Sequence, residues 1–436
     1  MKQGVLILIE RFGIGGIETH VGAIASSLGD QYDFYIAANN GTNIGYFKKL
    51  FKDVLLLSGN NLSENIDLLE KFLKDKNIQI VHVHQYGVFH EAIYVALTHK
   101  IRLFVTNHGY LYPIDSWREE LGNSRLVFWS NYVFKLADGV SAVSSKQKEF
   151  WQKEFPILKN KIVVTHNCVN VDDYKTTEVF SNQRFLMTVR LDGDKLPLIE
   201  GAVKFIDSLR AFPGFESSTL VIAGSGAESS MLKEKYKTCE HINFIGEYDD
   251  ISDELSKSFA LIGTGRSALE AIAAKRHVIL SGLFGFHGFL TDEKLKLGML
   301  ANLTGKNLES EDVTKAAKEF ASLSSLQREE VINKCYKIVR DDYGINRIRS
   351  EINKLYCVKM SAYPQSSDIM KDYLSTERLA FECRMRLFET EAKSTREVED
   401  CKYSLMMKER VLNDIIGSRS WKFLSKLRFL VYGKDR

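Results

Sequence analysis

The chain has 436 residues, of which 44% are hydrophobic and 26% are charged, and its net charge is +3. This length is too great for one ordinary core and fits two or three domains of normal globular composition. The small net charge excludes an electrostatic nucleic-acid binder, and six scattered cysteines without a C-x-x-C pair argue against structural zinc and favour a reducing compartment.

Residues 4–355 alternate short apolar runs with amphipathic helical patterns. The runs are mostly continuous, as in parallel strands that are covered on both faces, and their alternation with helices predicts right-handed βαβ units. The predicted strands are, in chain order, Val5–Ile9, Phe34–Ala38, Val54–Leu57, Ile80–Val83, Leu103–Thr106, Val140–Val143, Ile162–Thr165, Phe185–Val189, Leu220–Ala223, Ile242–Ile245, Ala260–Gly263 and His277–Leu280.

These strands are too many for one sheet, and the charged, polar stretch Asp172–Arg184 separates them into two sets. We therefore predict an α/β protein with two doubly wound, Rossmann-like domains that face each other across a cleft. The N-terminal domain spans residues 1–178 and the C-terminal domain residues 179–357. Ligands of such sheets bind at the carboxyl ends of the strands.

Residues 358–436 differ in composition and are predicted to form a helical extension. Residues 368–416 contain no Gly or Pro, although their heptads are too irregular to predict a coiled coil. The last twenty residues carry six Lys and Arg against Asp435, interleaved with Trp421 and other apolar residues. This mixture suits an anionic membrane surface better than a core helix or a solvated charge run.

Neither a signal peptide nor a membrane span is predicted. Only seven uncharged residues separate the two charges Lys2 and Glu10, and no apolar run approaches the ~20 residues of a transmembrane helix. We expect a cytoplasmic protein, peripheral at the inner face of the membrane if the tail binds lipid.

The most informative segment begins at Gly263. An apolar run stops there, and a helical pattern starts at once, with Glu270 in its early turns. Glycines let a phosphate approach the backbone, the N–H groups of a helix start can bind it, and a carboxylate can accept hydrogen bonds from ribose hydroxyls. Arg190 and Lys195 follow another apolar run about 75 residues earlier. Singly they would be ordinary surface charges, but the whole set suits a nucleoside diphosphate that carries a sugar.

Two further glycine turns follow predicted strands. The segment from Gly13 to Glu18 predicts either a loop that a diphosphate or sugar can approach or a tight strand–helix turn, and by itself it favours neither. A dinucleotide fingerprint is excluded, because G-x-G-x-x-G would need a glycine in place of Glu18. The turn Gly224-Ser-Gly226 is a weaker signal of the same kind, since any strand–helix loop favours glycine.

Three histidines lie in or after strands. His108 directly follows a strand and is either an ordinary loop histidine or a polar group near the reacting carbon. His82 and His84 flank Val83 with a spacing that metal sites also use. With no Asp, Glu or Cys nearby, we predict no metal at this pair.

Taken together, these segments resemble glycosyltransferase family 4, the retaining enzymes of the GT-B fold. The tail Ser418–Arg428 looks like a C-terminal segment of some bacterial surface-polysaccharide glycosyltransferases, which implies that type. The resemblance covers about residues 4–355 and rests on the order and spacing of several motifs. They are Gly15-Gly-Ile-Glu18, His108-Gly109, Ala137-Asp-Gly-Val-Ser-Ala-Val-Ser144, His166-Asn167, Arg190 with Lys195, Gly224-Ser-Gly226, and Gly263 to Glu270-Ala-Ile-Ala273.

The resemblance implies a hexosyltransferase and a role for each site residue. Arg190 and Lys195 would neutralise the donor diphosphate, Glu270 would bind the ribose, and His108 would lie beside the donor sugar. The other implied donor-binding positions are Gly15, Gly16, Gly224, Gly226, Gly263, Gly265, Arg266 and Ser267. The implied partners are a UDP- or GDP-linked sugar and a glycan or lipid-linked acceptor, and no cofactor or metal is expected.

The chain departs from the family pattern at several positions. The first glutamate of the family's pair should lie eight residues before Glu270, where the chain has Ile262, and glycines are replaced by Val189 and Leu196. These changes favour, as an alternative, a degenerate GT-B scaffold that acts through its C-terminal helical region. A nucleotide-sugar epimerase is a weaker alternative, because no converging acids and bases can be named for it.

Overall fold

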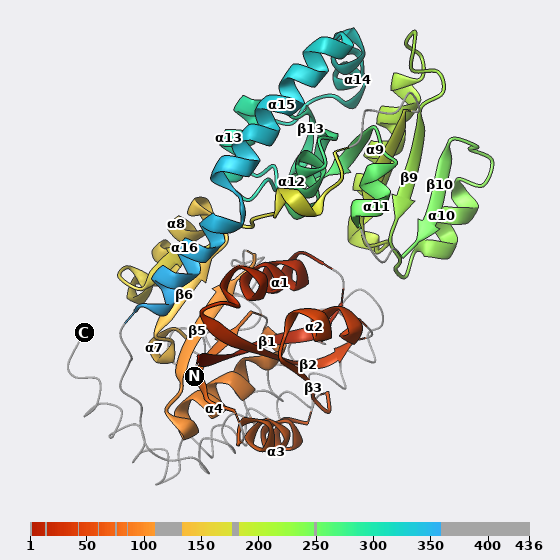
Figure 1. Cartoon of the computed structure of the whole chain (residues 1–436). Coiled ribbons are helices and arrows are strands. Elements are labelled where there is room, and N and C mark those ends of the chain that lie inside the picture. Colours follow the sequence, from red (N-terminus) through yellow and green to blue (C-terminus); the bar gives the residue numbers. More distant parts are fainter. Residues whose placement is uncertain are drawn as a thin grey trace. The chain divides into compact units, whose positions relative to one another are not determined.

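The computed structural model of the protein describes residues 2–13, 15–41, 43–59, 61–74, 76–84, 86–109, 133–176, 183–247 and 251–358 (Figure 1). The described chain divides into two compact units. Unit 1 comprises Met1–Ala142, Lys148–Val164 and the chain from Ile352 onward, and unit 2 comprises Val143–Gln147 and Thr165–Glu351. The predicted domain boundary at residues 178 and 179 lies outside the described residues, as do all but the first residue of the predicted C-terminal extension.

Unit 1 is built on a seven-stranded sheet with the order β3-β2-β1-β4-β5-β6-β7, in which every described pair of neighbours is parallel. Most of its strand residues are buried, which explains the continuous apolar runs in the sequence. The strands are β1 (Gln3–Phe12), β2 (Tyr32–Gly41), β3 (Asp53–Leu56), β4 (Ile78–Val83), β5 (Arg102–Asn107), β6 (Gly139–Ala142) and β7 (Ile162–Val164).

Helices alternate with these strands, as the sequence predicts. In α3, Asn61 caps the first turn by accepting a hydrogen bond from the N–H of Glu64, and Ile66 and Leu69 are buried in the core. The helical elements are α1 (Gly16–Leu28), α2 (Ile44–Leu50), α3 (Leu62–Leu73), η1 (Tyr86–Val88), α4 (Phe89–His99), α7 (Phe134–Leu136), α8 (Ser145–Glu154) and η3 (Pro156–Leu158).

Unit 2 contains a six-stranded sheet with the order β10-β9-β8-β11-β12-β13. Its strands are parallel except β13, which pairs antiparallel with β12. The strands are β8 (Arg184–Thr188), β9 (Thr219–Ala223), β10 (Ile242–Gly246), β11 (Ala260–Gly263), β12 (His277–Gly282) and β13 (Gly285–Phe289).

Several helices and short 3-10 turns complete unit 2. Ala268, Leu269 and Ile272 of α12 are fully buried, which accounts for its strongly amphipathic sequence. The elements are η4 (Val171–Asp173), η5 (Gly193–Lys195), α9 (Leu196–Leu209), α10 (Ser229–Lys235), α11 (Ile251–Ser256), α12 (Gly265–Ala273), α13 (Asp292–Met299), α14 (Val313–Ser322), α15 (Ser325–Asp342) and α16 (Ile345–Tyr356), whose last residues belong to unit 1.

All twelve predicted strands are present, with ends that differ by a few residues, and the prediction of two doubly wound sheets is confirmed. β13 was not predicted from the sequence, because its residues Gly-Phe-His-Gly-Phe contain two glycines, which weaken strand patterns. Among the described helices, none is both long enough and apolar enough to cross a membrane.

Candidate functional site

The predicted site residues of unit 2 lie at the carboxyl edge of its sheet. The chain runs from β8 through β9 to β10 on one side and then continues with β11 on the other side of β8, so the topological switch point lies between β8 and β11. Ligands of open α/β sheets bind at this point. Thr188 is level with Ala223 of β9, and Ile262 with Met187, so the loops after these three strands start at the same edge.

Gly224 and Gly226 follow β9, and the close approach of the loop after β8 requires both of them to be glycine. The N–H of Leu191 donates to the carbonyl of Ser225 at 2.9 Å, which extends the pairing of β8 and β9 beyond the strands. A Cβ on Gly224 would lie 2.0 Å from the Val189 oxygen, and one on Gly226 would lie 2.4 Å from the Leu191 oxygen. These glycines therefore fix the path of the loop that carries Arg190.

Asp192 contacts both residues of the predicted cation pair, Arg190 through its side chain and Lys195 through its backbone. Its carboxylate accepts a hydrogen bond from Nη1 of Arg190 at 2.9 Å, and its carbonyl accepts one from the N–H of Lys195 at 2.9 Å. The other carboxylate oxygen accepts from the N–H of Ala227 at 3.2 Å, in the loop after β9. The Arg190 side chain is 60% exposed, so its ion pair contributes at most about 1 kcal/mol and an incoming anion can replace Asp192.

The start of α12 has the features of an anion-binding helix terminus. Gly265 has a φ of +62°, in the left-handed region that glycine tolerates. The side chain of the N-cap residue Thr264 makes no capping hydrogen bond, and Ser267 Oγ donates to the Thr264 carbonyl at 3.0 Å. A helix start without a side-chain cap is suited to bind phosphate through its backbone N–H groups.

Glu270 and Arg266, both predicted to bind the donor, form an ion pair with each other. Nε of Arg266 donates to Oε1 of Glu270 at 3.0 Å, and the side chains are 12% and 7% exposed. Arg266 Nη1 also donates to the carbonyl of Cys168 at 2.8 Å. Arg266 thus orients the carboxylate from one turn earlier in α12, which points to a positioning role for this arginine.

Ile262 occupies the position where the family pattern has its first glutamate, and the structure shows why it is apolar. It lies within β11, fully buried in the hydrophobic core of unit 2. Only Thr264 separates the end of β11 from the start of α12, so no loop is available here to carry a second carboxylate. Sequence spacing alone could not distinguish this core position from a loop position.

In unit 1, the first glycine loop opens α1, as predicted. Gly15 is the N-cap residue, and a Cβ there would lie 2.8 Å from Oε2 of Glu18. Glu18 is buried, and burial raises the pKa of its carboxyl group above the ordinary value. A side chain at Gly16 would meet nothing within 4 Å. Of these two predicted donor-binding glycines, Gly16 is therefore the one with space for a ligand.

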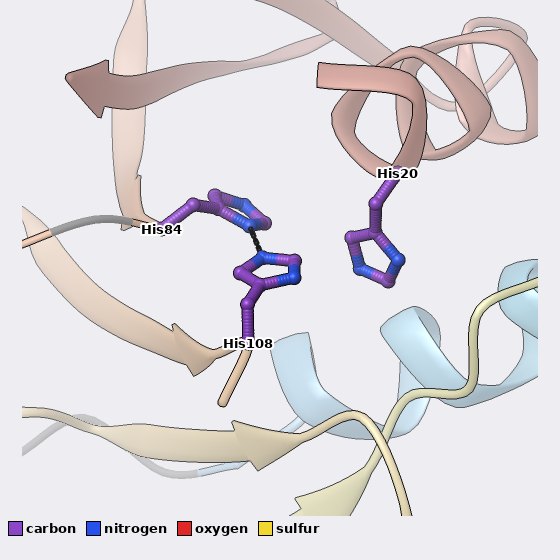
Figure 2. A group of neighbouring side chains, drawn as sticks. All are labelled: His20, His84 and His108. Atoms are coloured by element: carbon purple, nitrogen blue, oxygen red, sulfur yellow. Dashed lines mark hydrogen bonds between the residues drawn. The ribbon is translucent and has the colours of Figure 1, made fainter. Parts of the chain in front are cut away.

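His108 belongs to a cluster of three histidines, which Figure 2 shows. Its Nε2 lies 3.0 Å from Nδ1 of His84, so one ring donates a hydrogen bond to the other. The ring of His20, from α1, lies 4.9 Å from the His108 ring and nearly perpendicular to it. Burial lowers the pKa of His108 to about 3 and that of His84 well below its ordinary value, so both imidazoles are neutral at neutral pH.

His82 takes no part in this cluster's polar contacts. Its Nδ1 lies 2.8 Å from the hydroxyl of Tyr356 and its Nε2 lies 2.7 Å from Oγ1 of Thr106. His82 and His84, although only two residues apart in the sequence, therefore do not form a chelating pair. His20 was not predicted as a site residue, because no local pattern in the sequence links it to histidines more than sixty residues later in the chain.

Comparison with known proteins identifies the class of enzyme. Residues 14–173 match the family described as Glycosyltransferase Family 4. It is thus the N-terminal part of the chain, residues 14–173, that is similar to glycosyltransferase family 4. No curated protein matches the sequence.

Solved structures extend the comparison to both units of this glycosyltransferase. HepE from Anabaena, in complex with UDP-glucose, is 15% identical with a TM-score of 0.62, over 81% of this chain and 99% of HepE. TarM is 11% identical with a TM-score of 0.60, over 82% of this chain and 99% of TarM. Sucrose-phosphate synthase from Thermosynechococcus elongatus is 12% identical with a TM-score of 0.57, over 81% and 98%. At these identities the likeness concerns the fold, which is the GT-B fold.

Proposed function

We propose that this glycosyltransferase moves a sugar, with retention of configuration, from a nucleotide-diphosphate sugar to a glycan or lipid-linked acceptor in the synthesis of a cell-surface polysaccharide. The observation that carries the proposal is the edge of the second sheet at its switch point. There the cation Arg190 follows β8, and the start of α12, with Glu270 in its second turn, follows β11. This combination suits a diphosphate next to a ribose.

The proposed chemistry needs charge stabilisation more than a strong base. When the bond between the anomeric carbon and the diphosphate breaks, negative charge develops on the leaving phosphate. Arg190 and Lys195 would stabilise that charge together with the α12 N-terminus, so no metal is needed for this step. Arg190 would exchange Asp192 for the phosphate, while the acceptor hydroxyl attacks the same face of the sugar and its proton passes to the leaving diphosphate oxygen.

The first experiment is a thermal-shift assay with UDP, GDP, ADP, CMP and their sugars. We expect UDP compounds to stabilise the protein, because HepE was crystallised with UDP and UDP-glucose. The stabilisation should be much reduced in Glu270→Gln, which keeps the shape of the side chain and removes its charge. Proton NMR of the transferred sugar, recorded before the anomers equilibrate, then tests retention.

Turnover tests the predicted cations directly. Arg190→Ala and Lys195→Ala should each lower kcat/KM by about 100-fold or more, the effect expected when one group that stabilises a transition-state charge is removed. Lys204→Ala, which removes an exposed cation from the surface of α9, is the matched control and should retain wild-type activity. Wild-type turnover in both site variants would reject the assignment.

The buried Ile262 supports a second candidate, a GT-B scaffold without activity. Without the family's first glutamate, other residues must bind the donor-sugar hydroxyls or the sugar is not held. Donor-nucleotide binding with neither transfer nor hydrolysis over a broad panel of donors and acceptors would favour the scaffold. An epimerised nucleotide sugar as the product would instead indicate an epimerase.

A further inference from the structure

The histidine cluster lies at the switch point of the first sheet. His20 comes from α1, which follows β1, whereas His84 follows β4 and His108 follows β5 (Figure 2). β1 and β4 are neighbours, and the N–H of His84 donates to the carbonyl of Leu8 in β1 at 3.0 Å. The topology thus brings together three rings from separate segments at the edge where such sheets bind ligands.

The distances between the rings suit a shared cation. One nitrogen from each ring can be chosen so that all three lie within 4.8 Å of one another. Two nitrogens on a tetrahedral zinc ion lie roughly 3.3 Å apart, given Zn–N bonds of about 2.0–2.1 Å. The contact of 3.0 Å between His84 and His108 is already close to that separation. To reach the same separation, the His20 nitrogen would have to move closer to the other two by up to about 1.5 Å.

The state of the rings favours metal binding as well. His84 is 3% exposed. Its Nδ1 faces His108, whereas its other ring nitrogen, Nε2, is buried without a hydrogen-bond partner among the described residues, and one of the two, not both, can bind the shared ion. Buried polar atoms without a partner are rare and call for an explanation such as an ion. Imidazole nitrogens bind Zn²⁺, Ni²⁺ and Cu²⁺, and three such ligands leave the fourth position of a tetrahedral ion open.

We propose that His20, His84 and His108 form a binding site for a divalent cation of the zinc type, and that the bound ion inhibits sugar transfer by occupying His108. The site is not a cofactor site, because the proposed transfer uses Arg190 and Lys195 for the leaving phosphate. The inhibitory effect rests on the proposed function, whereas the binding does not.

Binding is tested on the full, untagged chain with Co²⁺ and Zn²⁺. We expect one Co²⁺ per chain, with the intense visible d–d absorption of tetrahedral cobalt, and loss of that absorption when Zn²⁺ is added. Isothermal titration calorimetry gives the Zn²⁺ affinity. If neither ion binds at concentrations up to about 100 µM, on the order of the weakest affinity that would matter here, the proposal is overturned.

Variants locate the ion. His20→Ala and His84→Ala should each weaken Zn²⁺ binding by about 100-fold or more, since even outer-shell partners of metal sites are worth 10–100-fold. His82→Gln is the matched control. It removes a buried imidazole whose ring centre lies 4.1 Å from that of His84, but whose two nitrogens contact Tyr356 and Thr106 instead. It should bind Zn²⁺ as wild type does. Equal loss in His82→Gln, or wild-type binding in the other two variants, would refute the site.

Thermal unfolding and circular dichroism show whether each variant folds. If His84→Ala does not fold, His84→Gln is used in its place. Transfer activity then tests inhibition: added Zn²⁺ should lower the rate, and a chelator should restore it. Zn²⁺ binding at full activity would reject the inhibitory role alone. If no transfer is found for any donor, the proposed function fails, and the binding assay still decides the metal site.

Discussion

The missing Cβ of Gly226 allows the close backbone contact that positions the loop of Arg190. A Cβ at this residue would lie 2.4 Å from the Leu191 oxygen, which is backbone and cannot move aside cheaply. We expect Gly226→Ala to lower the free energy of unfolding by about 1–3 kcal/mol, as other overpacked substitutions do, and to weaken the thermal shift by UDP, because the Arg190 loop must move.

Urea denaturation measures the stability change, and Gly201→Ala is its matched control. Gly201 lies in α9, where an added Cβ would meet nothing within 4 Å. There the same substitution should stabilise the protein by about 0.5–1 kcal/mol, because alanine is the better helix former. If both variants had the same effect, contact with Leu191 would not explain the glycine at 226.

At the scale of secondary-structure elements, α16 is joined to the chain after β7 by Glu351. The two carboxylate oxygens of Glu351 accept hydrogen bonds from the backbone N–H and from Nδ1 of His166, each at 2.8 Å. Nε of Arg347, one turn earlier in α16, donates to Oε1 at 2.8 Å. Burial acts to raise the pKa of Glu351, but the hydrogen bonds from His166 and Arg347 outweigh it and lower the pKa below the ordinary 4.5.

This network predicts a dependence of stability on pH. A carboxyl group whose pKa is lower in the folded state stabilises the protein above its unfolded pKa, and that contribution is lost as the pH falls through the folded pKa. Glu351→Gln should therefore lower the melting temperature at pH 7, and the difference from wild type should shrink below about pH 4.5. Melting temperatures of both proteins from pH 7 to pH 3.5 test this, and a constant difference would contradict it.

At the scale of the whole molecule, residues 417–436 lie outside the described residues, and their membrane affinity stays a prediction from composition. Each cation near an anionic surface contributes about 1 kcal/mol, so deleting these residues should weaken binding to phosphatidylserine vesicles by at least about tenfold. Vesicle co-sedimentation measures this, with neutral vesicles and high salt as controls. Unchanged binding after the deletion would count against a membrane role for the tail.

The sequence by itself determined the elements and the edge at which the site residues lie. Buried parallel strands produce continuous apolar runs, so all twelve predicted strands were found, and the residues after a strand necessarily lie at its carboxyl end. Arg190, Gly224 and Gly265 could thus be assigned to one edge of one sheet before the structure was known. Both inferences, the strands and the edge at which the following residues lie, depend only on residues that are close to one another in the sequence.

Only the tertiary structure decided which distant residues meet. Asp192 bridges the loops after β8 and β9, Arg266 holds Glu270, and Ile262 is a core residue of β11. The cluster of His20 with His84 and His108 likewise depends on the order of strands in the sheet. Strand order and side-chain packing are set by the balance of burial over the whole unit, and no local pattern in the sequence encodes them.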